Sequence, residues 1–74
     1  MLTVQTPRQL FGKRLREIRE KQNISQERLA EIVGGHRNYI GRLERGETNV
    51  TFDYIMKIAK ALKVKPATLF ELIP

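Results

Sequence analysis

Side chains that could recognise nucleic-acid bases lie close together in the middle of the chain. Arg37 and Asn38 are adjacent, and Arg42 follows slightly more than one helical turn after Arg37. An arginine guanidinium can donate two parallel hydrogen bonds to O6 and N7 of guanine, and an asparagine amide can pair with N6 and N7 of adenine. A helix that carries these three side chains could therefore read the edges of base pairs.

The residues before this group have the pattern of a short helix that ends in a glycine turn. Ser25 can cap its amino end, because a serine oxygen accepts one of the unpaired N–H groups of the first turn. We expect the apolar stripe of this helix to consist of Leu29, Ala30, Ile32 and Val33. Gly34 and Gly35 should end the helix, because glycine reaches positive φ without a Cβ clash.

A second short helix should follow, with Ile40 and Leu43 as its inward-facing pair. Most of the other positions around that pair hold side chains that are not typical of a core: Arg37, Asn38, Tyr39, Arg42 and Arg45. A helix with so few core positions and so many long donors is expected to contact another molecule.

The stretch from Ser25 to Arg45 resembles the helix-turn-helix of the phage-repressor/Cro-type (XRE-like) family of bacterial and phage DNA-binding regulators. The matching features are Gln26, Ala30, Gly34, Ile40, Leu43, the LERG sequence (Leu43 to Gly46) and the IAKALKV sequence (Ile58 to Val64). The resemblance covers about Phe11 to Phe70. The chain differs from the family pattern at Gly35, which replaces an apolar residue, and at His36, which replaces a Ser or Thr cap.

This resemblance implies an all-α fold: a single compact five-helix domain of the lambda-repressor-like DNA-binding type. It places Arg37, Asn38 and Arg42 at base-reading positions. The phosphate-contacting positions hold Gln26, Tyr39 and Arg45, with Thr48 and Asn49 in the next loop as further candidates. The resemblance also implies a buried structural ion pair between Arg19 and Glu44.

Three of these residues have alternative roles. Tyr39 could be a half-buried packing residue, and Asn38 could simply help to start the second helix. His36, the only histidine, is expected to be a turn residue near the DNA backbone rather than a ligand or a pH switch.

Two helices are expected around this motif on the amino- and carboxyl-terminal sides. The first follows a loose arm (Met1 to Gln5), opens with a capping box of Thr6 and Gln9, and runs from Pro7 to about Lys21. Its core face should hold Leu10, Phe11, Leu15 and Ile18. Gly46 should end the second motif helix, and Thr51 should cap the next one. The core face of that next helix should hold Phe52, Ile55, Ile58, Ala59 and Leu62.

The last segment, residues 66–74, is expected to open at Pro66 with a fifth short helix that ends at about Leu72. It carries four apolar residues: Leu69, Phe70, Leu72 and Ile73. Such a tail either closes the core or meets a partner, and we favour a homodimer interface. Because the chain ends soon afterwards, we expect no added ligand-sensing or cleavable domain.

The composition fits one small domain, residues 1–74, with an anionic partner. A chain of this size buries only about 60% of its unfolded surface, so pairing would add stability. The net charge of +6 and the pI of about 10.2 favour a polyanion. The sequence has no cysteine, no membrane-length apolar run and no signal-peptide pattern. We therefore expect a cytoplasmic, nucleoid-associated protein, and the resemblance implies a bacterial or phage source.

The leading hypothesis is a transcriptional regulator that binds double-stranded DNA sequence-specifically, as a homodimer on a two-fold symmetric operator. One helix spans too few base pairs for a monomer to be selective. The sequence does not choose among Cro-like repressors, restriction–modification controller proteins and antitoxins. The alternative is an antitoxin-like protein-interaction module that also binds DNA.

Other classes are disfavoured by what the sequence lacks. RNA modules depend on exposed aromatic platforms, whereas Phe11, Phe52 and Phe70 are expected in the core. The usual nucleophile, metal and phosphate-loop patterns of enzymes are absent from the sequence. We therefore expect no enzymatic activity, no cofactor, no metal site and no small-molecule ligand.

Overall fold

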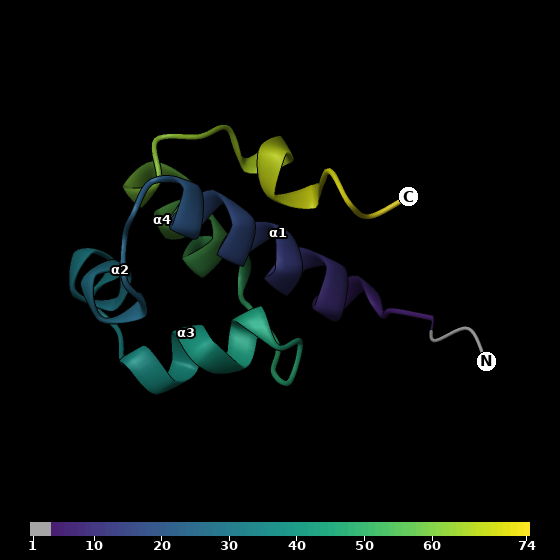
Figure 1. Cartoon of the computed structure of the whole chain (residues 1–74), viewed down its shortest axis with the longest axis horizontal. Helices are drawn as coiled ribbons and strands as arrows, with labels where there is room; N and C mark the ends of the chain where they lie inside the picture. The colour runs from purple at the N-terminus through teal and green to yellow at the C-terminus, as the bar shows by residue number, and fades with distance from the viewer. Residues whose placement is uncertain (1–3) are drawn as a thin grey trace.

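The computed structural model describes residues 4–74 and contains four α-helices followed by a 3₁₀ helix (Figure 1). These elements are α1 (Pro7–Lys21), α2 (Gln26–Val33), α3 (Arg37–Glu44), α4 (Phe52–Ala61) and η1 (Pro66–Phe70). Within this range there is no strand, and no helix is long and apolar enough to cross a membrane. The first three residues of the expected amino-terminal arm lie outside the described residues.

The fifth helix differs from its prediction. Residues 66–70 form a 3₁₀ helix, in which the N–H of Thr68 donates to the carbonyl of Lys65. A segment this short closes i→i+3 hydrogen bonds more easily than a run of i→i+4 bonds. The described residues therefore hold four α-helices, and the five-helix count is not confirmed.

Side chains cap the amino ends of three α-helices as predicted. Thr6 accepts from the N–H of Gln9 while the Gln9 side chain accepts from the N–H of Thr6, which completes a capping box before α1. The hydroxyls of Ser25 and Thr51 accept N–H groups from the first turns of α2 and α4. His36 makes no such bond, so α3 depends on tertiary packing rather than on a cap.

All four α-helices end in one way, with a single residue in the left-handed conformation. These residues are Asn23 (φ 58°), Gly34 (77°), Gly46 (73°) and Lys63 (57°). After each of them, the next N–H donates to the carbonyl five residues earlier, which is the Schellman hydrogen bond. Gly34 and Gly46 therefore confirm the predicted helix ends.

Gly35 does not work as expected, because its φ is not positive. A Cβ at this position would collide with the hydroxyl of Tyr54 in α4. The absence of a side chain at Gly35 is therefore required by the close approach of α4 to the turn between α2 and α3.

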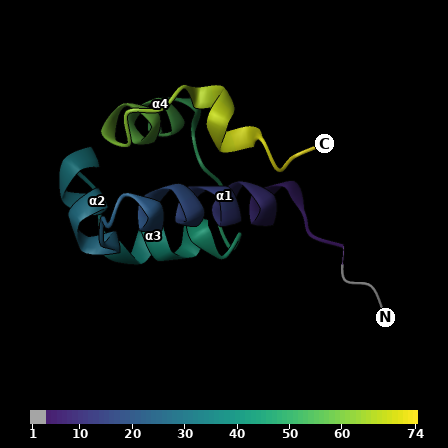
Figure 2. The same cartoon turned by 45° about the horizontal axis from the view of Figure 1, so that its top comes forward.

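The core is formed by one apolar face from each element. Its fully buried members are Leu15, Leu29, Ile40, Leu43, Ile58, Leu62 and Leu69. α1 packs against both α3 and η1, and Figure 2 shows α3 and α4 on opposite sides of α1. The backbones of α1 and α3 approach each other at Gly12, where a Cβ would collide with the carbonyls of Leu43 and Glu44.

Three residues predicted in the core are exposed: Ile32 by 45%, Phe52 by 64% and Phe70 by 38%. Ile32 points away because Ala30 and Val33, together with Leu29, set the buried face of α2, and Ile32 lies about 100° from the centre of that face. Phe52 is the first residue of α4, so its side chain lies at the end of the helix, beyond the buried residues Ile58 and Leu62.

Candidate nucleic-acid interface

The three base-reading candidates lie on the outer side of α3. Arg37, Asn38 and Arg42 are exposed. The predicted inward pair is confirmed, because Ile40 and Leu43 are buried at 0% and 2% exposure and hold α3 onto the core. α3 therefore presents these three polar side chains to solvent.

A surface notch of about 250 Å³ joins these side chains to the start of α2. It is lined by Gln26, Arg37, Asn38, Gly41, Arg42 and Arg45. Gly41 forms the floor of the notch and is itself buried, with the side chains of Arg45 and Gln26 lying over it. Three arginines around one notch create a positive potential that suits an anionic ligand. Five of the expected DNA contacts thus lie together, whereas Tyr39, Thr48 and Asn49 do not line the notch.

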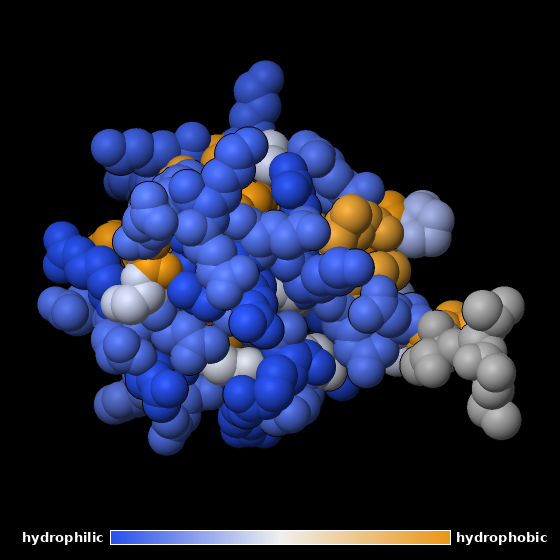
Figure 3. Space-filling model, viewed as in Figure 1, coloured by the Kyte–Doolittle hydropathy of each residue, from blue (hydrophilic) through white to orange (hydrophobic). Residues whose placement is uncertain are grey.

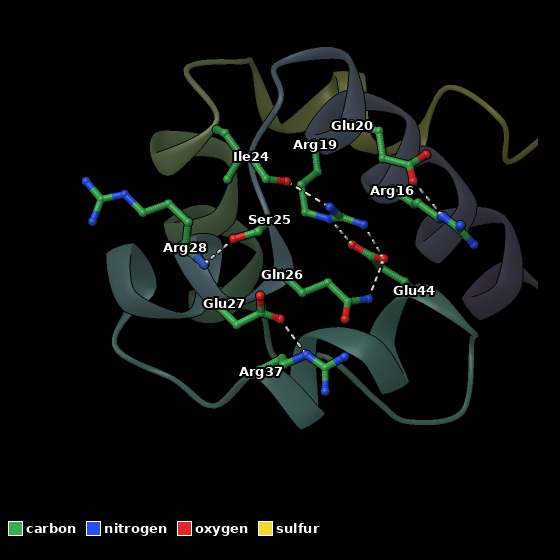
Figure 4. A network of polar contacts seen from close by, with 10 residues as sticks. All are labelled: Arg16, Arg19, Glu20, Ile24, Ser25, Gln26, Glu27, Arg28, Arg37 and Glu44. Atoms are coloured by element: carbon green, nitrogen blue, oxygen red, sulfur yellow. Dashed lines mark hydrogen bonds and ion pairs between the residues drawn. The ribbon is translucent and has the colours of Figure 1, made fainter.

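Arg37 makes an ion pair that the sequence did not indicate. Its Nε lies 2.5 Å from Oε1 of Glu27, in the first turn of α2 (Figure 4). The two side chains are 59% and 62% exposed. The guanidinium of Arg37 is therefore held on the surface, across the turn of the motif, and is not directed into the core.

A buried ion pair joins the three helices around the motif. Nε and Nη2 of Arg19 in α1 donate to Oε2 and Oε1 of Glu44 in α3 at 2.6 and 3.0 Å, and Nη1 of Arg19 donates to the carbonyl of Ile24 at 2.7 Å. Gln26 of α2 also donates to Oε1 of Glu44, at 3.0 Å (Figure 4). The pair implied by the resemblance is therefore present. Hydrogen bonding to Glu44 raises the pKa of Arg19, although burial opposes this shift.

The bond to Glu44 changes the role that Gln26 can have. One N–H of its amide donates to Glu44 inside the protein, and the second N–H of this half-buried amide remains as a donor. The backbone N–H groups of Gln26 and Glu27, in the first turn of α2, have no acceptor within residues 4–74. Unpaired N–H groups at a helix start suit an anion.

Arg45 is also paired with an acid at the surface. Its Nε and Nη2 donate to the two carboxylate oxygens of Glu47 at 2.8 and 3.2 Å. This hydrogen bonding raises the pKa of Arg45 and lowers the pKa of Glu47. Both side chains are more than half exposed, so an incoming anion could share or displace the contact.

Tyr39 is a half-buried packing residue, which is the alternative role considered for it from the sequence. Its ring lies edge-to-face against Tyr54, with centroids 5.0 Å apart, and its hydroxyl donates to the carbonyl of Asn49 at 2.8 Å. Tyr39 thereby orders the loop after α3, in which Thr48 is half-buried and the Asn49 side chain is exposed. His36 is exposed in the turn before α3.

The tail was assigned as a dimer interface, and this assignment is wrong for Leu69. Leu69 is 0% exposed and packs in the core, because η1 lies against α1 and α4. Phe70 packs on Phe11 with ring centroids 5.6 Å apart and remains partly exposed. Leu72 is 36% exposed and Ile73 is half-buried. Figure 3 shows apolar surface near the carboxyl terminus of an otherwise mainly hydrophilic face.

Several contacts were missed because they join residues that are distant in sequence. Arg14 of α1 binds the carboxyl-terminal segment by donating to the carbonyl of Thr68 at 3.1 Å and to the carboxylate of Glu71 at 3.0 Å.

Phe52 and Met56 form further exposed apolar surface on α4. Among residues 4–74, no three His, Cys, Asp or Glu side chains are grouped closely enough to hold a metal ion.

Known proteins share both the sequence and the fold of this chain. The helix-turn-helix family model matches residues 15–69. Control protein C.BamHI of Bacillus amyloliquefaciens is 51% identical over 65 residues, which cover 86% of this chain and 80% of that protein. The restriction-modification controller protein C.AhdI from Aeromonas hydrophila has a similar structure, with a TM-score of 0.82 and 47% identity over 84% of this chain and 94% of that one.

The fold is also similar to that of the P22 c2 repressor, whose structure was solved in complex with a synthetic operator. The TM-score is 0.78 and the identity is 35%, over 85% of this chain and 96% of the repressor chain. The family match includes α2, α3, α4 and the second half of α1. The chain therefore belongs to the helix-turn-helix family of transcriptional regulators.

Proposed function

We propose that this chain is a sequence-specific DNA-binding regulator of the repressor or controller type, which acts as a homodimer on a two-fold symmetric operator. The observation that carries the proposal is the notch with three arginines on the exposed side of α3. A B-DNA major groove is about 12 Å wide and admits one α-helix. C.BamHI and C.AhdI, which are controller proteins, support the same function.

In this proposal the amino end of α3 enters the major groove. Arg37 and Arg42 donate to guanine O6 and N7, and Asn38 pairs with adenine N6 and N7. Each such pair contributes about 1–3 kcal/mol of discrimination against the wrong base. The buried pair of Arg19 and Glu44 supports this readout by fixing α3 against α1.

Phosphates are bound on either side of the groove. At the start of α2, the backbone N–H groups of Gln26 and Glu27 receive one phosphate, together with the second amide N–H of Gln26, whose first N–H donates to Glu44. Beyond α3, Arg45 and the loop of Thr48 and Asn49 contact the backbone further along. Tyr39 supports this loop through its bond to the Asn49 carbonyl.

The homodimer supplies a second α3 helix for the second half-site of the operator. Two copies related by a two-fold axis place their α3 helices about 34 Å apart, one turn of DNA. The partly exposed tail residues Phe70, Leu72 and Ile73 are the proposed contact between the copies. The proposal places the protein in the cytoplasm, where its DNA is accessible.

Selection from random DNA duplexes tests this function. The wild type should enrich a palindromic consensus with half-site centres about 10 base pairs apart. Arg37→Ala should lose its preference at one base pair in each half-site. Lys65→Ala is the matched control, because it removes the same charge from an exposed site outside the notch. A wild type that retains duplexes without any consensus, or an Arg37→Ala variant that loses affinity evenly across sequences, would contradict the proposal.

A further inference from the structure

The geometry points to Glu27 as a positioning residue for base recognition. We infer that its carboxylate orients Arg37 so that the outer edge of the guanidinium faces a guanine. This inference rests on the proposed function, because it requires α3 to lie in the major groove.

The ion pair leaves the outer edge of the Arg37 guanidinium accessible. Glu27 contacts Nε, at 2.5 Å, which is the nitrogen nearest the side-chain stem. Figure 4 shows the two terminal nitrogens pointing away from Glu27. Nη1 and Nη2 together form the pair of donors that matches O6 and N7 of one guanine. One guanidinium can therefore contact Glu27 and a base at the same time.

Glu27 is well placed to act as a fixed support. It lies in the first turn of α2, where the helix dipole stabilises a carboxylate. An exposed arginine without a partner must lose rotamer freedom when it binds, and a preformed contact reduces that loss. The first turn of α2, which contains Glu27, is also the proposed phosphate site, so the negative charge of Glu27 should by itself weaken DNA binding. Orienting Arg37 would offset this repulsion.

The same helix contains a control for charge. Glu31 lies one turn after Glu27, is 68% exposed and pairs with Arg28 at 3.6 Å. Neither Glu31 nor Arg28 lines the notch. Glu31→Gln therefore removes the same charge as Glu27→Gln without touching Arg37. Glu27→Asp keeps the charge but shortens the side chain by one methylene. It therefore distinguishes an effect of the negative charge from an effect of the contact with Arg37.

The test measures dissociation constants for two duplexes with each variant. One duplex is the selected consensus, and in the other the G·C pair whose identity depends on Arg37 is replaced by A·T. The ratio of the two constants should be about 5- to 150-fold for the wild type, which corresponds to about 1–3 kcal/mol. Glu27→Gln and Glu27→Asp should each lower this ratio about 1.5- to 5-fold, which is the scale expected for one exposed ion pair. Glu31→Gln should leave the ratio unchanged.

Two results would overturn the inference alone. In the first, Glu27→Gln strengthens binding to both duplexes equally, so that Glu27 acts only as a charge near phosphate. In the second, Glu27→Asp keeps the wild-type ratio. If Arg37→Ala itself left the wild-type preference intact, base reading by Arg37 and the inference would both fail. Thermal unfolding of each variant checks that the fold is retained.

Discussion

Tyr54 determines which residue can occupy the turn between α2 and α3. Its ring packs on Tyr39, and its hydroxyl is buried against Gly35 without a hydrogen-bond partner in residues 4–74. A buried hydroxyl left unpaired costs about 1–3 kcal/mol. The sequence identifies Gly35 as a departure from the family pattern, but the reason lies in a residue of another helix, which a local pattern cannot show.

A double-mutant cycle tests the contact between Gly35 and Tyr54. Gly35→Ala should destabilise the wild type by about 1–3 kcal/mol, because the new Cβ collides with the Tyr54 hydroxyl. In the Tyr54→Phe background the nearest remaining ring carbon is 3.4 Å from that Cβ. The cost of Gly35→Ala should then fall below about 1 kcal/mol. Urea unfolding at a fixed protein concentration measures both values, and equal costs in the two backgrounds would disprove the collision.

The phenol of Tyr54 should also make stability depend on alkaline pH. Burial raises its pKa in the folded state, and Tyr39 adds a smaller effect. The folded protein thus keeps this proton above about pH 10, where a tyrosine in the unfolded chain loses it. The corresponding stability is present below about pH 10 and is lost as the pH rises through the folded pKa. Melting curves between about pH 8 and 11 should fall more steeply for the wild type than for Tyr54→Phe, whereas parallel curves would contradict this assignment.

At the scale of the elements, the helix ends follow a single rule. Asn23, Gly34, Gly46 and Lys63 all adopt positive φ, although only glycine does so without a Cβ penalty. Asparagine tolerates this conformation better than most residues, because its short polar side chain can bond locally. Lys63 is therefore the one helix end in residues 4–74 where the residue type and the backbone conformation disagree.

Lys63→Gly should stabilise the fold by about 0.5–1 kcal/mol, because it removes the strain of the left-handed conformation. Lys60→Gly is the matched control. It removes an identical side chain three residues earlier, inside α4, and should destabilise by about 1 kcal/mol. Thermal unfolding of the two variants should therefore give shifts of opposite sign. A destabilised Lys63→Gly variant would show that the Lys63 side chain contributes more stability than the relief of backbone strain returns.

The bounds of α1 to α4 could be predicted because their signals are local. Thr6, Ser25 and Thr51 cap the helices that directly follow them. Gly34 and Gly46 end helices through their own positive φ, which does not depend on the packing of those helices. Burial was less predictable, since the exposure of Ile32 and Phe52 depends on which neighbouring helix covers them. The site was predicted as a set of exposed donors. Its ion pairs to Glu27 and Glu47 were not, because each depends on side-chain directions in the folded chain.

Across the whole molecule, the apolar residues that remain on the surface are candidates for the contact between two copies of the chain. Phe70 and Leu72 lie at the end of the chain, and Phe52 and Met56 lie on α4. Single exposed apolar residues are normal on a monomer. A small domain with a marginal core nevertheless gains stability when a second copy covers such residues. The burial of Leu69 means that its replacement would damage the core and could not report on the interface.

Leu72→Glu is the informative change, because Leu72 is partly exposed and lies beyond η1. A carboxylate there should be tolerated in the monomer but should be costly in an apolar contact, where it would lose its hydration. Sedimentation should therefore show a monomer for Leu72→Glu and a dimer for Val4→Glu, which places the same charge on an apolar residue that is 86% exposed. The Leu72→Glu monomer should also bind a palindromic consensus only as weakly as a single half-site, because the second α3 is no longer held one DNA turn away. If Leu72→Glu remained dimeric, the contact between the copies would have to lie elsewhere, and Phe52→Glu would be the next variant to examine.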